Sequence, residues 1–449
     1  MVNVLWSAGL LVGLMAGPMM PVRAETAAAV PPPDARYKAD ILVVIAHPDD
    51  DTDATNYLSR AVLDEGKRVA VVFSTRGNSG ANVVGMEQSK ALSDVREMEA
   101  RRSLAARGIT NVWFLHGSDT ATQDVLHSLE TLGHGEALDE TVRLIRLTQP
   151  DVIMTWMPAY VAGENHGDHQ ASGVVATEAF DLAGSPTAFP EQINAPRNRF
   201  SIANYGEGLR PWQAKKLYYF SDATHPEFLD GHGPRYLATD ASRSRGGTYA
   251  DINKLAWDLY ATQIEGPAAM HTYINMPDVF LLGKSLVTAP VTGDVWAGVT
   301  PGPIAYAPPV VQPTPEAHGV TVALGGPWAF YTAFYRAHGL SVLEGLVPPQ
   351  TAMSANHELW LPLLLENHTG SAAEVELVAE MPAGWSSATK ATSYHLEPGA
   401  VYPVQLFLTG PAQVKGDAPQ RLRWVAKVGG QQVSEAGIEV YPEYNGVPQ

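Results

Sequence analysis

The chain has 449 residues, of which 45% are hydrophobic, and a formal net charge of −17 at pH 7. This negative charge argues against nucleic acid or an anionic membrane as a partner, and a neutral or cationic sugar fits it better. The sequence contains no Cys, which excludes disulfides and leaves His and carboxylates as the metal ligands. The length is ample for two domains, and it indicates no particular oligomeric state.

Residues 1–24 are predicted to be a signal peptide. An apolar run over residues 4–20 ends in small residues that fit a cleavage site before Glu25. The run is short for a spanning helix, although no Lys or Arg precedes it, so a single N-terminal anchor is the alternative. We expect a periplasmic or secreted protein that has no stable membrane insertion after signal removal. Residues 25–38 follow as a flexible lead-in.

The next part of the chain alternates between two hydrophobic patterns. Continuous apolar runs occur at 41–46, 69–73, 111–115 and 151–156, and helical patterns lie near 53–65, 87–107, 136–148 and 169–183. This βαβα series predicts a Rossmann-like parallel sheet with helices on both faces. No Gly-x-Gly-x-x-Gly follows the first run, which argues against a dinucleotide site.

The first apolar run stops at a group of polar residues. Residues 41–46 are typical of a parallel strand that is buried on both faces. His47, Pro48 and three carboxylates follow at the carboxyl end, where open parallel sheets bind ligands. Because Pro48 restricts the local backbone, His47 and Asp50 can turn towards one point. The alternative is a polar N-cap for the next helix.

A second cluster of His and Asp follows another apolar run. Residues 151–156 are strand-like, and His166-Gly167-Asp168-His169 comes just past them. A solvated loop can hold one His–Asp pair by chance. Two such clusters, each past a predicted parallel strand, are much harder to explain in this way.

Together the clusters supply the ligands of a metal site. His47, Asp50 and His169 offer two imidazoles and one carboxylate. Three protein ligands with an open position for water describe a catalytic zinc site, with one Zn²⁺ per chain. Asp49 and His166 would then remain free beside the metal as acid and base groups.

The two motifs resemble those of the PIG-L/LmbE-like family of zinc-dependent N-deacetylases, which are N-acetylglucosaminyl deacetylase-like enzymes. The resemblance covers residues 39–290. The family more often has Glu where Asp51 stands and often has Pro where Gly167 stands, but neither change removes a ligand. The resemblance implies an LmbE-like α/β domain, one zinc ion and hydrolysis of an N-acyl group, most often N-acetyl, on an amino sugar or glycoconjugate.

The resemblance also implies catalytic roles. Asp49 would take a proton from water, and His166 would protonate the leaving amine or stabilise the oxyanion, oriented by Asp168. Two other functions stay open. One is an amidase that acts on a larger N-acyl group or conjugate, and the other is a non-catalytic secreted carbohydrate-binding protein.

Two further residues match family positions that lie near the substrate. Arg96 would steady a substrate hydroxyl or anionic group, and the alternative is a salt bridge to Glu99. Asn78 would line the pocket, and the alternative is a simple turn residue.

The C-terminal part of the chain has a different hydrophobic pattern. Residues 291–350 are predicted to be a Pro-rich linker with an aromatic cluster. Residues 351–449 contain short alternating runs separated by turn signals, which predicts an antiparallel, immunoglobulin-like β-sandwich. No catalytic constellation is evident in it, so we expect a separable domain that lends no catalytic group.

Overall fold

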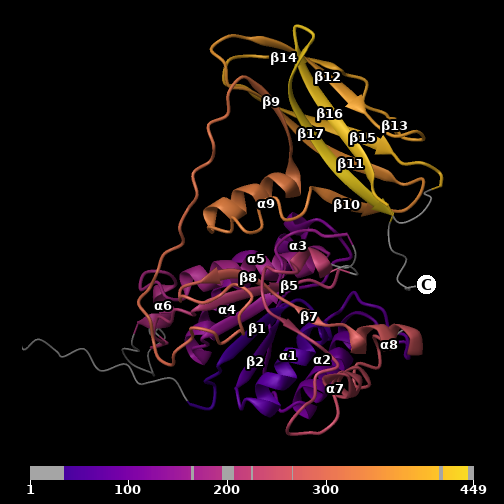
Figure 1. Cartoon of the computed structure of the whole chain (residues 1–449). Coiled ribbons are helices and arrows are strands. Elements are labelled where there is room, and N and C mark those ends of the chain that lie inside the picture. The colour runs from indigo at the N-terminus through magenta and orange to yellow at the C-terminus, as the bar shows by residue number, and fades with distance from the viewer. Residues whose placement is uncertain are drawn as a thin grey trace, which may run out of the picture.

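The computed structural model describes residues 35–162, 166–194, 207–223, 226–264, 266–413 and 418–442. The predicted signal peptide lies outside these residues. Among the described residues, no helix combines the length and the apolar composition that a membrane crossing requires. Figure 1 shows two bodies, an α/β domain that carries the earlier part of the chain and a β-sheet unit above it, with helix α9 between them.

The first body is built on a six-stranded sheet with the strand order β3-β2-β1-β4-β5-β8. Its strands are β1 Ile41–Ile45, β2 Val69–Phe73, β3 Asn111–Phe114, β4 Val152–Trp156, β5 Lys216–Phe220 and β8 Leu281–Ser285. β1 to β5 pair in parallel, and β8 runs antiparallel to β5. The predicted α/β fold is therefore confirmed, and the strand order reverses between β1 and β4.

Helices cover both faces of this sheet. In β1, Leu42 and Val44 belong to one core, whereas Ile41, Val43 and Ile45 belong to the other. The first core includes α3 Val125–Leu132, α4 His134–Thr148 and α5 Gly167–Leu182, and the second includes α1 Thr55–Ser59, α2 Ser89–Ala106 and α7 Tyr249–Trp257. Because β1 is buried on both faces, its sequence is continuously apolar.

Shorter elements complete the α/β domain. They are the 3₁₀ turns Asp50–Ala54 and Pro226–Leu229, the π turn Arg60–Asp64, the helices α6 Pro190–Ile193 and α8 Pro267–Asn275, and the paired strands β6 Arg235–Tyr236 and β7 Asp278–Val279. α7 ends at Trp257, and α8 is a separate helix. Gly266 and Pro267, immediately before and at the start of α8, are residues that favour such a break.

The C-terminal unit consists of two sheets that share one core. One sheet has the order β10-β17-β16-β12-β14 and the other β13-β15-β11-β9. The strands are β9 Val320–Leu324, β10 Gln350–Met353, β11 Glu358–Asn367, β12 Ala373–Glu380, β13 Ser386–Ser387, β14 Ser393–Leu396, β15 Val401–Thr409, β16 Gln420–Val428 and β17 Gln431–Pro442. All of their pairings are antiparallel except that of β10 with β17. The immunoglobulin-like class stays a prediction.

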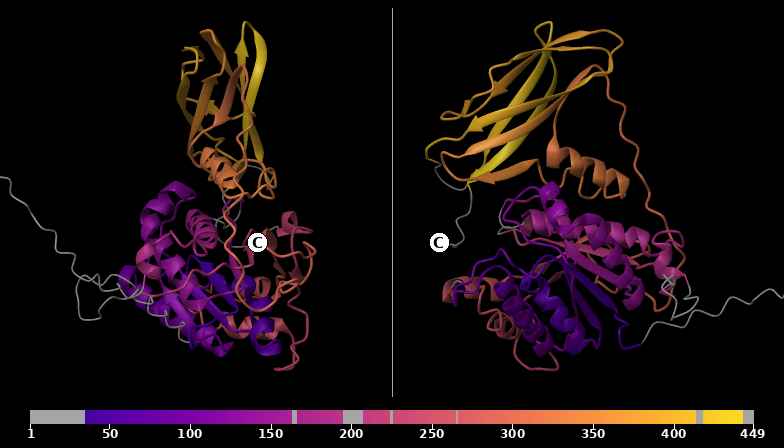
Figure 2. Two further views of the ribbon diagram at one scale, coloured as in Figure 1. Left: turned by 90° about the vertical axis from the view of Figure 1, so that its left-hand side faces the viewer. Right: turned by 180° about the vertical axis from the view of Figure 1, so that it is seen from behind.

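The segment 291–350, predicted as a linker, contains structured elements. β9 pairs with β11 of the C-terminal unit, and α9 spans Gly326–Ala337. Tyr331, Phe334 and Tyr335 of α9 are buried in the same core as α3, α4 and α5. Figure 2 shows α9 lying along the top of the α/β domain from both sides. The aromatic cluster therefore joins the two bodies, because these side chains pack into the core of the first.

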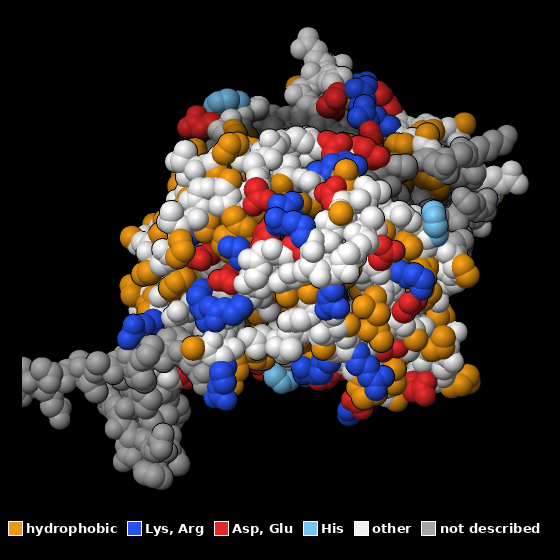
Figure 3. All heavy atoms as spheres, turned by 60° about the horizontal axis from the view of Figure 1, so that its bottom comes forward, with side chains coloured by type: hydrophobic (Ala, Val, Ile, Leu, Met, Phe, Trp, Pro, Cys, Tyr) orange, Lys and Arg blue, Asp and Glu red, His pale blue; other side chains and the backbone are white. Residues whose placement is uncertain are grey.

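The lower face of the molecule carries charges of both signs. Figure 3 shows Lys and Arg side chains interspersed with Asp and Glu side chains on this face. Exposed ion pairs such as that of Lys90 with Asp94 occur on the α/β domain. Exposed pairs of this kind contribute about 0–1 kcal/mol each to stability.

Candidate metal centre and active-site cavity

The two predicted clusters meet beyond the carboxyl ends of β1 and β4. These strands are neighbours where the strand order of the sheet reverses, and open parallel sheets bind their ligands at such a switch point. His47 follows β1, and His169 lies in the first turn of α5, which begins at Gly167. The topology thus brings together two motifs that are distant in the sequence.

Asp50 is held through one of its two carboxylate oxygens. Oδ2 accepts hydrogen bonds from the backbone N–H groups of Ala46 and His47, both at 2.9 Å, and from Trp156 Nε1 at 2.6 Å. Oδ1 lies 3.4 Å from His47 Nδ1 and 3.5 Å from His169 Nε2. The hydrogen bonds to Oδ2 therefore fix the carboxylate so that Oδ1 faces both imidazoles.

The other nitrogen of each imidazole faces a second carboxylate. His47 Nε2 lies 3.3 Å from Asp168 Oδ2, and His169 Nδ1 lies 3.2 Å from Asp222 Oδ2. Trp156 stacks on the His169 ring, with centroids 4.1 Å apart and planes inclined by 3°. Outer carboxylates of this kind fix the tautomer and the orientation of histidine ligands.

Two of the separations among these atoms suit a zinc ion. Ligand atoms in a tetrahedral zinc site, at about 2.0–2.1 Å from the metal, lie about 3.3–3.4 Å apart. Asp50 Oδ1 lies 3.4 Å from the His47 nitrogen and 3.5 Å from the His169 nitrogen. All three side chains are buried. His47, Asp50 and His169 therefore have donor atoms of the kind that zinc binds, and the two distances from Asp50 suit it.

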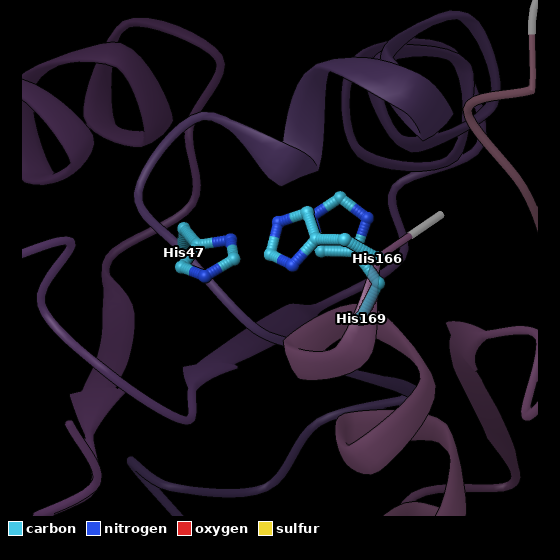
Figure 4. Close-up of side chains that lie close together, drawn as sticks. All are labelled: His47, His166 and His169. Atoms are coloured by element: carbon cyan, nitrogen blue, oxygen red, sulfur yellow. The ribbon is translucent and has the colours of Figure 1, made fainter. Parts of the chain in front are cut away.

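His166 is the third imidazole at this centre. Figure 4 shows its ring beside those of His47 and His169, and one nitrogen from each ring lies within 4.8 Å of the others. A ligand set of three histidines is thus the alternative to one that contains Asp50. His166 Nδ1 accepts a hydrogen bond of 3.4 Å from the backbone N–H of Asp168, so the neutral ring carries its proton on Nε2.

The charges around the centre favour a cation. Burial disfavours a charged imidazole, but Asp50 raises the pKa of His47 to about 10. Burial also lowers the pKa of His169. Asp50 and Asp222 outweigh this effect, so that the pKa of His169 is raised well above its usual value. Burial and the neighbouring imidazoles lower the pKa of His166. The carboxylates that hold protons on two of the rings would also attract a divalent metal ion.

Asp49 stands beside the ligands and reaches the cavity. Its backbone has a φ of 123°, a conformation that is rare for a residue with a side chain. Burial raises the pKa of Asp49 to about 7, although Arg96 opposes this shift. Arg96 Nη2 lies 2.9 Å from Asp49 Oδ1 and donates to the carbonyl of Pro48 at 2.7 Å. A carboxyl group that titrates near neutral pH suits a general base.

The partner of Arg96 differs from the alternative considered in the sequence. Arg96 pairs with Asp49, whereas Glu99 accepts hydrogen bonds from the backbone N–H and the hydroxyl of Thr262. The three-residue spacing allows an intrahelical pair, but tertiary packing gives each side chain another partner. Arg96 thus pairs with Asp49 and also borders the cavity.

Asp51 anchors the turn that carries Asp49 and Asp50. Its carboxylate accepts hydrogen bonds from Arg107 and from the hydroxyl of Tyr260, and all three side chains are fully buried. The Asp51 carbonyl accepts a further hydrogen bond from Thr55 Oγ1 at 3.0 Å. This buried network holds the strained backbone next to it in place.

Asp168 contacts both His47 and His166, through different groups. Its carboxylate accepts hydrogen bonds from the backbone N–H of Thr120 at 2.7 Å and from Thr120 Oγ1 at 3.1 Å, and it contacts His47. The side chain therefore orients His47, and His166 is contacted by the Asp168 backbone. The reason is local, because the first turn of α5 directs this carboxylate towards the loop before α3.

Asn78 does not line the cavity in this structure. Its Oδ1 accepts a hydrogen bond of 3.1 Å from the backbone N–H of Asp119. The adjacent residues Ser79 and Gly80 lie on the cavity wall in its place. Asn78 therefore joins two loops that border the cavity, which matches the turn-residue alternative.

The metal centre opens into a cavity of about 490 Å³, a volume within the range of small-molecule sites. Its charged wall consists of Asp49, Asp50, Asp53, Asp119, Asp222 and Arg96. Another part of the wall is apolar and includes Trp257, Met270 and Tyr273 from α7 and α8. Trp257 and Tyr273 stack with ring centroids 5.1 Å apart. The cavity thus combines carboxylates with aromatic and aliphatic side chains.

Sequence reasoning missed Asp222 and Trp156. Asp222 comes two residues after β5 ends, which is the same relation that His47 has to β1. The position of Asp222 after an apolar run was visible in the sequence. However, its neighbours Ser221 and Ala223 are not usual metal ligands, so it did not form a motif. Trp156 is the last residue of β4, and its pattern alone predicts only a buried strand residue.

The fold and the site define a class, an α/β domain whose cavity contains a buried His–Asp–His cluster with a further carboxyl group and a third imidazole beside it. Residues 42–180 match the model of the PIG-L family, described as GlcNAc-PI de-N-acetylase. This part of the chain is therefore similar to the PIG-L family.

Curated relatives and a solved structure are similar to parts of the chain. A 1D-myo-inositol 2-acetamido-2-deoxy-alpha-D-glucopyranoside deacetylase 1 from Catenulispora acidiphila is 28% identical over 37% of this chain and 56% of the relative. The deacetylase of that name from Thermobifida fusca is 27% identical over 40% of this chain and 60% of the relative. The N,N'-diacetylchitobiose deacetylase of Pyrococcus horikoshii is 17% identical over 54% of this chain and 84% of that one, with a TM-score of 0.39. The matches therefore span little more than half of the first two relatives.

Proposed function

We propose that this protein is a zinc-dependent hydrolase that removes an N-acetyl group from an amino sugar or glycoconjugate. The main support is Asp49, a carboxyl group with a pKa of about 7 that borders the same cavity as the His47, Asp50 and His169 side chains. The match of residues 42–180 to the PIG-L family and the activity named for the curated relatives support the acyl group and the sugar.

His47, Asp50 and His169 would hold one zinc ion per chain. When bound, zinc would lower the pKa of a water molecule and polarise the acyl oxygen. Asp49 takes a proton from the attacking water and returns it to the leaving amine as the C–N bond breaks, and Arg96 holds this carboxylate in place through its 2.9 Å contact. His166 donates a hydrogen bond from Nε2 to the developing oxyanion, because its Nδ1 already accepts one.

The charge of the cavity supports a neutral or cationic substrate. Among the described residues of the wall, the five Asp side chains outnumber the cationic groups, which are Arg96, already paired with Asp49, and the rings of His47 and His169. A phosphate or carboxylate group on the substrate would meet repulsion there. The aromatic wall from α7 and α8 would instead favour the apolar face of a sugar ring.

We expect acetate release from N,N'-diacetylchitobiose or another uncharged N-acetylglucosaminide, and loss of that activity after treatment with a chelator. Restoring one equivalent of Zn²⁺ per chain should restore the rate. The assay would measure acetate and free amine together, across chitooligosaccharides, N-acetylglucosamine glycosides and the acetylated inositol glycoside of the curated relatives.

The same panel distinguishes the alternatives. A matched N-butyryl or larger N-acyl sugar that is cleaved faster than the N-acetyl sugar would favour the broader amidase. Stoichiometric zinc without hydrolysis of any member would contradict the enzyme and favour a carbohydrate-binding protein. A phosphorylated sugar should be the poorest substrate, since its charge opposes that of the cavity wall.

We also propose export, so that the mature chain begins near Glu25 and acts outside the cytoplasm. The support is the apolar segment over residues 4–20 and the small residues that end it. Intact-mass measurement on the native protein should give a chain that starts at Glu25. A cytosolic protein that retains Met1 would contradict this proposal.

A further inference from the structure

The C-terminal unit makes contacts beside the second catalytic motif. Tyr335 of α9 donates a hydrogen bond of 3.0 Å to the carbonyl of Pro158, and Tyr331 donates one to the side-chain carbonyl of Gln170. Pro158 precedes the motif and Gln170 directly follows His169. Both donors are buried, so these contacts are part of the packed core and not of a mobile surface.

Gln350 of β10 makes a third contact at this place. Its Oε1 accepts a hydrogen bond of 2.7 Å from the backbone N–H of Ala162, four residues before His166. Gln350 is 5% exposed, so no water would readily replace this acceptor. Gln350 therefore anchors β10 to the backbone at Ala162.

Gln123 links β10 to the cavity wall. Its Oε1 accepts from the backbone N–H of Ala352 at 3.1 Å, and its Nε2 donates to the Ala352 carbonyl at 3.1 Å. Thr351 Oγ1 donates to the same Oε1 at 3.2 Å. Both Gln123 and Ala352 border the cavity. The C-terminal unit therefore contributes Ala352 to the described cavity wall.

The loop that carries Gln123 also supports the second motif. Thr120 donates two hydrogen bonds to Asp168, and the carbonyl of Thr122 accepts one of 2.8 Å from the backbone N–H of Gly167. A Cβ at Gly167 would lie 2.9 Å from that carbonyl, which explains why this position has no side chain. The position of β10 is thereby transmitted to Asp168, which contacts His47.

We infer that the C-terminal unit is an integral part of the active site, in which Gln350 anchors β10 and Gln123 is the positioning residue through which β10 places Asp168. The unit does not supply a group that touches the reacting atoms. It holds the loop that supports Gly167 and Asp168. The inference rests on the proposed function for its kinetic consequence, and its structural consequence can be measured without activity.

The test uses matched variants of the full-length chain. Gln350→Met keeps the size of the side chain but removes the acceptor, Gln350→Glu keeps an acceptor, and Gln431→Met changes an exposed residue at the start of β17. We expect Gln350→Met to lower kcat on N,N'-diacetylchitobiose by about 10- to 100-fold. KM and bound zinc should stay close to those of the unchanged protein, and Gln350→Glu should recover much of the loss.

Hydrogen exchange supplies a readout that does not depend on catalysis. The Ala162 amide should exchange about 10-fold faster in Gln350→Met, the effect of losing one hydrogen bond of about 1.4 kcal/mol, and it should be unchanged in Gln431→Met. If Gln350→Met fails to fold, Gln123→Met, on a half-buried loop, should produce the same fall in kcat. Unchanged exchange and kcat in a folded Gln350→Met variant would overturn the inference. The unchanged protein could also lack deacetylase activity while Ala162 exchanges faster in Gln350→Met. That result would overturn the proposed function but would support the contact between Gln350 and Ala162.

Discussion

Replacing Asp49 by Asn should leave the metal bound and lower kcat by about 10²- to 10⁴-fold, the contribution that a general base typically makes. Asn is the appropriate substitution, because it is among the residues most often found with a positive φ and Asp49 has a φ of 123°. The loss should appear in kcat with little change in KM, since the amide keeps the shape of the side chain. Zinc content by elemental analysis and kcat on N,N'-diacetylchitobiose provide the measurement.

Asp53→Asn is the matched control for this prediction. Asp53 is on the same turn and borders the same cavity, so its substitution removes the same charge without removing the proposed base. We expect its kcat to change by less than about 10-fold. If Asp49→Asn loses its zinc, Asp49 is a ligand and the roles of Asp49 and Asp50 are reversed.

Replacing His169 by Ala should remove most of the bound zinc, whereas replacing His166 by Ala should retain the zinc and lower the rate. Loss of a residue that merely supports a ligand weakens metal binding by about 10- to 100-fold, and loss of a ligand should exceed this. The reason for the difference is Asp50, whose Oδ1 lies 3.4 Å and 3.5 Å from the His47 and His169 nitrogens. Zinc affinity measured by competition with a chromogenic chelator separates the two variants.

The same pair of variants tests the alternative ligand set. If His47, His166 and His169 hold the metal, both substitutions should lower zinc affinity to a similar extent. Circular dichroism and the melting temperature must show that both variants are folded. Equal zinc loss in two folded variants would mean that Asp50 supports the ligands without being one. His166 would then bind the metal and could not donate to the oxyanion.

The sequence predicted the α/β body of this protein well. Buried parallel strands have continuous apolar runs, so β1, β2, β3 and β4 could be placed to within about one or two residues. The separate helices α8 and α9 could not be predicted in the same way. α9 lies in a Pro-rich stretch, and its aromatic residues are buried only because the first body provides the surface against which they pack.

At the site, the sequence determined which residues stand beyond β1 and β4, since the carboxyl ends of neighbouring parallel strands share one edge of the sheet. That was enough to propose His47, Asp50 and His169 together. The partners of these side chains were decided by tertiary structure. Arg96 contacts Asp49 and not Glu99, and Asp222 lies behind His169, because packing brings together side chains that the sequence separates. The role of Gln350 belongs to the same category, since strand pairing in the C-terminal unit determines where β10 meets the α/β domain.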